Sequence, residues 1–197
     1  MIKIYLLYNI LFLNILLSNE PKPPAINSEW KIIKEGPILI SWINNKSIDW
    51  CKAVATIPNN IEIVQQILED KKNYPNVFER IEKTSISDSG NVHIVLDMPW
   101  PFAGRDYVVK YNQYNEGNDV VYQFFSVIDS SIPIQENYIR LVNATGEWRI
   151  TSLDKTNTLV TYIWNGELLG DFPDFALTQA WIQQGEEVMT WLKNAVE

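Results

Sequence analysis

The sequence predicts an α+β domain in which a long antiparallel sheet is covered by one carboxy-terminal helix. Between residues 81 and 165, short segments of alternating apolar and polar residues are separated by turn sequences, which is typical of an antiparallel meander. After residue 173 the apolar residues follow helical spacing instead, and their stripe is broader than a surface helix needs. This helix should therefore lie across the sheet. With 197 residues, 46% of them hydrophobic, one domain with a sizeable core is expected.

The first 18 residues are typical of a signal peptide. Lys3 precedes an apolar run over residues 4–17, which is shorter than the roughly 20 residues that span a bilayer, and Ser18 is a small residue at its end. We expect cleavage after Ser18 and a secreted or periplasmic protein; an uncleaved anchor is the alternative. Residues 19–28 predict a stiff proline-rich tether, and residues 29–197 the folded domain.

The secondary structure elements can be assigned in order from periodicity and turn residues. Strands are expected over residues 30–34, 38–42, 51–57, 81–87, 92–98, 107–111, 120–124, 138–142, 146–153 and 158–165. A short helix is expected over residues 61–68, with Asn59 or Asn60 as its cap. Asp171 can cap the last helix, because Pro173 then falls in the first turn, where its missing amide costs nothing.

A proline-rich connection lies between two of these strands. Trp100 and Phe102 alternate with Pro99 and Pro101, so the segment cannot extend a central ladder and should form a short, stiff loop. Its two aromatic side chains should either pack back on the domain or form one wall of a cavity mouth. The doublet of Arg105 and Asp106 at the next strand is interpreted as an ion-paired strand end on the surface, without a catalytic role.

Composition excludes several classes of function. A formal net charge of −8 argues against a nucleic-acid partner and against electrostatic attachment to anionic membranes, so membrane contact would have to be local and apolar. Cys51 is the one cysteine and His93 the one histidine, which predicts neither a metal site nor a cofactor. His93 and Asp97 share a strand face, but at ~3.3 Å per residue they lie about 13 Å apart, too far for a proton relay.

Three local motifs occur in a fixed order along the chain. A tyrosine–proline step with a following phenylalanine comes after the short helix, and an arginine–aspartate–aromatic–valine run follows the proline-rich loop. The third motif joins a glycine–x–tryptophan strand, a threonine–x–valine–x–tyrosine sequence and a glycine-then-proline entry to the last helix. The residues are Tyr74, Pro75, Phe78, Arg105, Asp106, Tyr107, Val108, Gly146, Trp148, Thr158, Val160, Tyr162, Gly170 and Pro173. Together these motifs resemble the START lipid-transfer domains, within the Bet v 1-like helix-grip superfamily, over residues 29–197.

The resemblance implies a curved antiparallel sheet that grips the last helix around an apolar tunnel for one ligand. The expected cavity lining consists of Val92, Ile94, Leu96, Tyr107, Val109, Tyr111, Tyr122, Phe124, Phe175, Ile182 and Met189. The expected gate consists of Trp100, Phe102, Leu168, Leu169 and Phe172, and Arg105, Asp106 and Trp148 are motif residues with a structural role. Sterol-carrying members place a charged pair where this chain has Val92 and Tyr111, which argues against a sterol.

The implied function is to bind and carry one lipid or other hydrophobic small molecule, as a monomer that touches membranes transiently. The alternative is an enzyme on the same scaffold, similar to aromatic polyketide cyclases and dehydratases. Asp97 and Tyr111 are the acid–base candidates that such an enzyme would use, but no neighbouring group in the sequence is expected to perturb them. A third possibility is an interaction domain whose tunnel is filled by bulky side chains and binds no ligand. The sequence does not exclude it.

Overall fold

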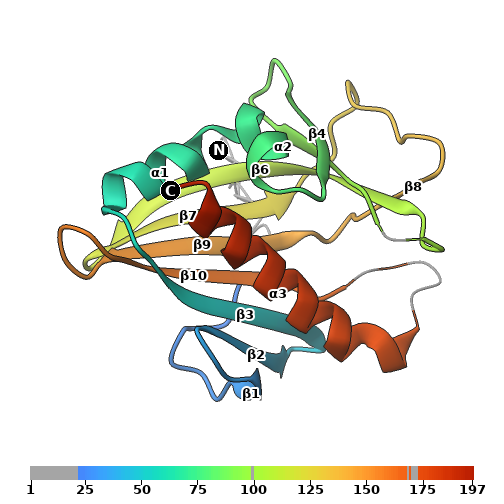
Figure 1. The fold of residues 1–197 in the computed structure, drawn as a ribbon. Helices are drawn as coiled ribbons and strands as arrows, with labels where there is room; N and C mark the ends of the chain where they lie inside the picture. The colour runs from blue at the N-terminus through green and yellow to red at the C-terminus, as the bar shows by residue number, and fades with distance from the viewer. Residues whose placement is uncertain (1–21, 99, 168, 170–172) are drawn as a thin grey trace, which may run out of the picture.

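The computed structural model describes residues 22–98, 100–167, 169 and 173–197, which form one long sheet and one long helix (Figure 1). The predicted signal peptide and the start of the tether lie outside the described residues. The helices are α1 (Ile61–Glu69), η1 (Lys71–Asn73), α2 (Tyr74–Val77), η2 (Asp174–Ala176) and α3 (Leu177–Asn194). The strands are β1 (Lys31–Lys34), β2 (Ile38–Asn45), β3 (Ile48–Ile57), β4 (Ile81–Ile86), β5 (Val92–Leu96), β6 (Gly104–Glu116), β7 (Asp119–Ser126), β8 (Tyr138–Arg140), β9 (Thr145–Ser152) and β10 (Thr158–Asn165). The predicted α+β class is confirmed.

The sheet is antiparallel along its main path, in the order β1-β2-β3-β10-β9-β7-β6-β5-β4. The expected continuous meander is wrong at one strand, because β8 leaves this path and pairs parallel to the start of β6, with Gly104 opposite Tyr138. The register explains the exception. β7 ends at Ser126 opposite Val109, so the same edge of β6 from Gly104 to Asp106 lacks a β7 partner, and β8 fills it.

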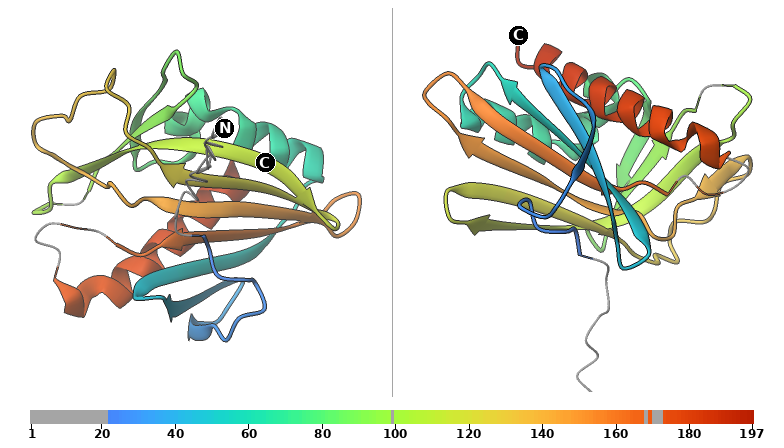
Figure 2. Two further views of the ribbon diagram at one scale, coloured as in Figure 1. Left: turned by 180° about the vertical axis from the view of Figure 1, so that it is seen from behind. Right: turned by 90° about the horizontal axis from the view of Figure 1, so that it is seen from below.

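Helix α3 lies across the concave inner face of the sheet, as the broad apolar stripe predicts (Figure 1, Figure 2). Its buried residues include Trp181, Met189 and Leu192. The α-helix begins later than expected, at Leu177, and its N-cap residue Ala176 makes no side-chain cap. The predicted cap, Asp171, lies outside the described residues. No helix among the described residues is long and apolar enough to cross a membrane.

The short helix α1 covers one end of the inner face. Of the two expected caps the structure uses Asn60, whose side-chain oxygen accepts a hydrogen bond from the Ile63 amide at 3.0 Å. Asn59 instead donates to the backbone oxygen of Val196 at 3.0 Å, which ties the start of α1 to the end of the chain. Val64 and Leu68 are the buried residues of α1.

The segment before β1 packs against the outer face of the sheet, on the side opposite α3 (Figure 2). Pro24 is buried there, and the Lys52 ammonium donates to the backbone oxygen of Ile26 at 3.1 Å and lies 4.3 Å from the centre of the Trp30 ring. The second half of the predicted tether, from residue 22, is therefore part of the folded body. Apolar side chains anchor it, whereas the sequence shows only its proline content.

Candidate functional site

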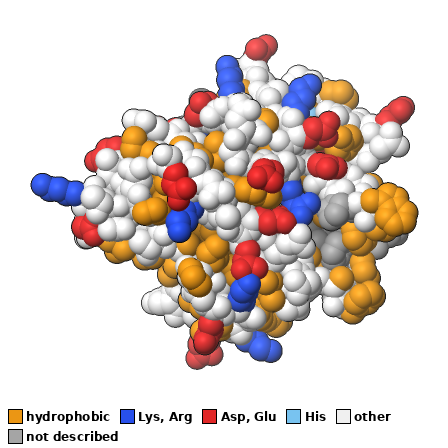
Figure 3. Space-filling view, in the orientation of Figure 1, with side chains coloured by type: hydrophobic (Ala, Val, Ile, Leu, Met, Phe, Trp, Pro, Cys, Tyr) orange, Lys and Arg blue, Asp and Glu red, His pale blue; other side chains and the backbone are white. Residues whose placement is uncertain are grey.

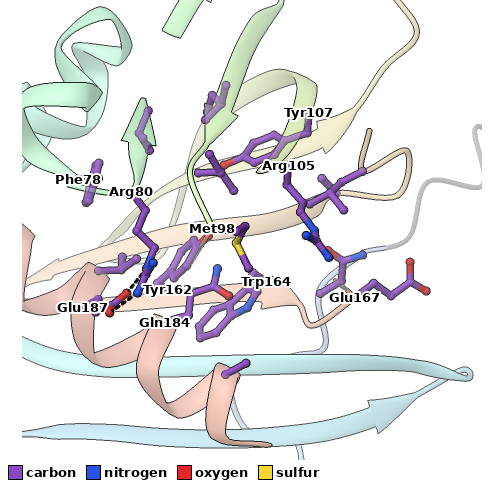
Figure 4. A pocket seen from close by; sticks show the side chains of 18 of the residues that line it. Phe78, Arg80, Met98, Arg105, Tyr107, Tyr162, Trp164, Glu167, Gln184 and Glu187 are labelled. Atoms are coloured by element: carbon purple, nitrogen blue, oxygen red, sulfur yellow. Dashed lines mark hydrogen bonds and ion pairs between the residues drawn. The ribbon is translucent and has the colours of Figure 1, made fainter. Parts of the chain in front are cut away.

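The candidate site is a cavity of about 310 Å³ between α3 and the inner face of the sheet. Strands β5, β6, β9 and β10 form its floor, and residues of α2 and α3 form its walls. Because side chains alternate across a strand, each strand contributes every second residue, and these inward positions are mostly apolar or aromatic. Figure 4 shows side chains from the sheet and from α3 converging on this space.

The floor carries a row of stacked rings on β9 and β10. Trp148 lies opposite Tyr162 in the strand register, and their ring centres are 4.2 Å apart with an interplanar angle of 25°. Two residues further along β10, the Trp164 ring lies 4.8 Å from the Tyr162 ring at 16°. We call Trp148, Tyr162 and Trp164 the aromatic ladder. Because these rings stack face on face, they present a continuous row of aromatic edges to the cavity.

Four tyrosines line the cavity; Tyr74 is bonded to the backbone, and the other three phenols are those of Tyr107, Tyr111 and Tyr162. Burial raises the pKa of each hydroxyl above its usual value of about 10, because the phenolate is poorly solvated there. All three side chains therefore stay protonated at neutral pH and act as hydrogen-bonding groups. The Tyr74 hydroxyl donates to the backbone oxygen of Leu68 at 2.8 Å.

An ion pair joins α3 to the sheet at the cavity wall (Figure 4). Arg80, just before β4, binds Glu187 of α3 through two contacts of 2.5 and 2.7 Å. Burial alone would raise the pKa of Glu187, but hydrogen bonds from Arg80 and Gln183 lower it below its usual value. The pair is bidentate and partly buried, so it fixes the distance between the helix and the edge of the sheet.

Arg105 is not the surface residue that the sequence suggested. Its guanidinium is buried at the cavity, where it donates to the backbone oxygens of Ala103 and, at 2.9 Å, of Leu169. Burial lowers the pKa of Arg105 from its usual value. These bonds tie the proline-rich loop to the segment before α3, which explains why an arginine occurs at the strand entrance.

Asp106 points to the opposite face because neighbouring residues of a strand alternate. It is 0% exposed, and its carboxylate accepts two hydrogen bonds from Arg140, at 2.9 and 2.7 Å, and contacts His93 Nε2 at 2.8 Å. Burial would raise the pKa of Asp106, but the bonds from Arg140 and His93 lower it. The interpretation of Arg105 and Asp106 as a surface ion pair is therefore wrong: both are buried, on different faces, with different partners. His93 and Asp97 were expected on one strand face, but His93 contacts Asp106 of β6 on the outer face, whereas Asp97 lines the cavity.

Five of the eleven expected lining residues do line the cavity: Ile94, Leu96, Tyr107, Tyr111 and Phe124. Val92, Val109, Ile182 and Met189 do not; they pack within the core around the cavity. Tyr122 is covered by the end of α1, where its hydroxyl donates to Glu69 at 2.7 Å. Phe175 is 91% exposed, because it lies in the turn η2 and not on the stripe of α3 that the expected earlier helix start would give it. A position on the inner face of the sheet therefore does not by itself place a residue at the cavity, because the inner face is covered by core packing on both sides of the cavity.

The expected gate residues have different surroundings. Phe102 lines the cavity, and Trp100 is 93% exposed. Leu169 is half-buried, and Leu168 and Phe172 lie outside the described residues. Figure 3 shows apolar side chains gathered at the end of the molecule where the β5–β6 connection and the start of α3 lie. The gating role of these residues stays a prediction.

Several lining residues were missed by the sequence reasoning. They include all three rings of the aromatic ladder, of which Trp148 and Tyr162 were noted as motif residues only, and Val188 and Trp191 of α3. The signal was present in β10, where Tyr162 and Trp164 follow the same period of two as the inward residues of β5. Within the described ranges, no group of three or more histidine, cysteine or acidic residues is arranged to hold a metal ion.

Sequence comparison finds only distant similarity. No family model matches the sequence. An uncharacterized protein from Pseudomonas aeruginosa is 22% identical over 180 residues, which cover 88% of this chain and 89% of that protein.

Solved structures resemble the fold more strongly. Human StAR-related lipid transfer protein 5 matches 86% of this chain and 87% of its own with a TM-score of 0.77 and 15% identity. A STAR-related lipid transfer protein fragment from Xanthomonas axonopodis matches 85% and 98% of the two chains with a TM-score of 0.74 and 16% identity. The Zhui aromatase/cyclase from Streptomyces matches 74% and 92% with a TM-score of 0.52 and 18% identity. At these identities the likeness establishes the fold.

Proposed function

Because the chain has the START helix-grip fold, we propose that it binds one lipid or other hydrophobic small molecule beneath α3 and carries it as a monomer. The observation that supports this most is the open space of about 310 Å³ under the helix. A domain that had lost binding would fill this space with side chains. The volume lies at the small end of ligand pockets, which span roughly 300–1,000 Å³. It suits a single-chain lipid or a compact ring system better than a lipid with two chains.

The polar groups of the cavity favour binding over catalysis. Arg80 and Glu187 neutralise each other, and the phenols are held protonated by burial, so neither offers a general base at neutral pH. His93 lies on the outer face against Asp106. The cyclase alternative rests on Asp97, which is exposed at the cavity. The charge that Asp97 interacts with, Arg80, is already bound to Glu187, and Asp97 itself faces solvent, so we propose a carrier.

We also propose that the protein is exported and that its exposed apolar end touches a membrane. Trp100 and Phe175 project from the connection and the turn beside the cavity, at 93% and 91% exposure. Aromatic rings are suited to the membrane interface. With a net charge of −8, attachment should depend on apolar insertion and respond little to salt.

The test is native mass spectrometry of the purified protein, followed by extraction and identification of what it carries. We expect one hydrophobic molecule per chain. Ala180→Phe puts a ring into the cavity from α3, so the adduct should be lost, with roughly 1–3 kcal/mol of overpacking at most. Thr178→Phe, on an exposed position of the same helix, should keep it. A wild-type protein that carries nothing and takes up nothing from mixed lipid vesicles would overturn the proposal.

A further inference from the structure

One polar atom at the cavity lacks a partner. Among the described residues, Trp164 Nε1 and Ser41 Oγ are the buried side-chain nitrogen and oxygen atoms without a hydrogen bond. Ser41 lies on the outer face of β2, because its neighbour Trp42 stacks on Trp181 of α3. Trp164 lines the cavity and is 4% exposed. A buried donor without a partner is costly, so an unsatisfied one in a cavity indicates a place for a ligand atom.

A second buried tryptophan, in contrast, has a hydrogen-bond acceptor for its indole N–H. Trp181 is equally buried, but its Nε1 donates to the backbone oxygen of Gly166 at 3.0 Å. The indole N–H is a donor only, so the missing partner of Trp164 must be an acceptor. Met98 and Gln184 line the same cavity as Trp164 (Figure 4). Both side chains are unbranched and flexible, so an incoming group can displace them and reach Nε1.

The surface around this donor is a row of aromatic edges. Trp148, Tyr162 and Trp164 stack at 4.2 and 4.8 Å with interplanar angles of 25° and 16°. The face of a flat ring system gains from edge-to-face contact with such a row, beyond the area that it buries, whereas a flexible acyl chain does not. An apolar cavity of ~150 Å³ holds one benzene molecule. The observed 310 Å³ is about twice that and has room for two to three fused rings.

We propose that the ligand is a flat, fused-ring molecule with a carbonyl or similar acceptor oxygen. Its rings lie against the aromatic ladder, and its oxygen accepts the hydrogen bond of Trp164 Nε1. The inference rests on the proposed function, because it names the chemistry of the molecule that the cavity carries. Trp164 is the residue that selects for the acceptor, and the ladder selects for flatness.

The test compares 9-fluorenone with fluorene, which have the same three-ring skeleton and differ in the carbonyl. Isothermal titration should show that the wild-type protein binds fluorenone about three- to tenfold more tightly, as expected for one added hydrogen bond. Trp164→Phe keeps a ring in the ladder and removes the donor. In this variant the two compounds should bind equally, at about the wild-type affinity for fluorene.

Two matched variants control for other causes. Trp181→Phe makes the same chemical change in a tryptophan away from the cavity, so it should lower stability and keep the preference for fluorenone. Tyr162→Phe removes a cavity hydroxyl from the same ladder and should also keep it. Loss of the preference in Tyr162→Phe would assign the donor to a phenol and overturn the role of Trp164.

A second measurement needs only the wild-type protein, in case Trp164→Phe does not fold. The indole N–H signal of Trp164 can be assigned in a ¹⁵N spectrum by linking it to the ring protons of the same indole, of which the one on Cη2 lies close to Gly185. Fluorenone should move this signal downfield, and fluorene should not. Equal affinities for the two compounds in the wild type, or an unmoved indole signal, would overturn the inference. If oleate binds and neither fused-ring compound does, the carrier function stands and the ligand class is wrong. If none of the three binds, both proposals fail.

Discussion

On the outer face of the sheet, buried charges have several partners each, whereas on the inner face the indole of Trp164 has none among the described residues. Asp106 is bonded by Arg140 and His93, and Arg149 contacts Glu116, Asp119 and Glu147 at 2.6, 3.0 and 3.2 Å. The outer groups hold strands together, and their bonding is complete within the chain. The inner donor contributes nothing to the fold. The comparison teaches that burial alone does not mark a functional residue, and that a buried polar atom without a partner is informative where it lines a cavity, as Trp164 Nε1 does.

The largest effect should come from breaking the outer network at its centre. Asp106→Ala leaves Arg140 and His93 with no carboxylate between them, and removing one member of such a buried pair costs about 3–5 kcal/mol. Urea denaturation measures the free energy of unfolding. The folded fraction should bind ligand as the wild type does, because Asp106 points away from the cavity.

Asp88→Ala is the matched control, since Asp88 is exposed and should cost less than ~0.5 kcal/mol. The pH dependence of the free energy of unfolding in acid is a further check on the role of Asp106. The pKa of Asp106 is lower in the folded protein, so its stabilising effect is present above the unfolded value of about 4 and is lost as pH falls through the folded value. A wild-type protein and an Asp106→Ala variant of equal stability at pH 7 would contradict the outer-face account.

A smaller effect is expected at Lys52, which lies on the outer face under the segment that precedes β1. Burial lowers the pKa of Lys52 to about 8, while in the unfolded chain it is about 10.4. Between these values the unfolded chain binds more protons, so the free energy of unfolding should rise with pH from about 8 to 10. Burial also raises the pKa of Cys51, which opposes this rise above about pH 8.5. Melting temperatures at pH 7.5, 8.5 and 9.5 should therefore show the rise in a Cys51→Ala background.

Lys52→Met in the same Cys51→Ala background removes the titrating group and should flatten the melting-temperature profile over this range. The interval stops at pH 10 because the inner phenols act in the opposite direction above it. Their pKa values are raised in the folded protein, so stability falls once the unfolded chain begins to lose those protons. A rise that persists in Lys52→Met would show that another group is responsible.

The smallest effect on stability should come from the exposed apolar end. Trp100→Ser/Phe175→Ser alters two side chains that face solvent, so the free energy of unfolding should change by less than about 0.5 kcal/mol for each. Binding to phosphatidylcholine vesicles, measured by co-sedimentation in 0.1 and 0.5 M salt, should nevertheless be lost. The wild type should bind equally at both salt concentrations.

Leu153→Ser provides the control for vesicle binding. Leu153 is also an exposed apolar residue, but it lies beside the turn between β9 and β10, at the opposite end of the molecule (Figure 1). This variant should bind vesicles as the wild type does. If it loses binding to the same extent, general surface hydrophobicity is the cause and the apolar end has no special role.

The sequence predicts those features that depend on local periodicity. The strands from β4 to β10, the cap at Asn60 and the stripe of α3 each follow from the spacing of a few residues. β8 could not be placed, because its pairing depends on where β7 stops relative to β6, and register is a property of two strands. Phe175 was misplaced for a related reason, since one turn of difference in the helix start moves it from the stripe to the solvent.

The site itself was predicted less completely than the fold. Period-two patterns identify the inner face, and Ile94, Tyr107 and Phe124 were found in this way. They do not show how far core packing extends over that face, which is why Val109 was expected at the cavity and Trp164 was not. Partners distant in the chain, such as Arg140 for Asp106, arise from β8 lying against β6. No pattern within a single strand contains this information.

Gly185, in the middle of α3, has a consequence for how such a cavity changes its capacity. A Cβ at this position would lie 2.5 Å from Ile40 Cδ1 and 3.3 Å from Ala53 Cβ and Trp164 Cη2. The helix therefore touches the sheet most closely along this edge, and the Arg80–Glu187 pair sets the gap on the other. The tilt of α3 between these two contacts consequently determines the volume of the cavity. We expect that a chain with alanine in place of Gly185 would hold the helix further from the sheet, and so accept a larger ligand with the same lining residues.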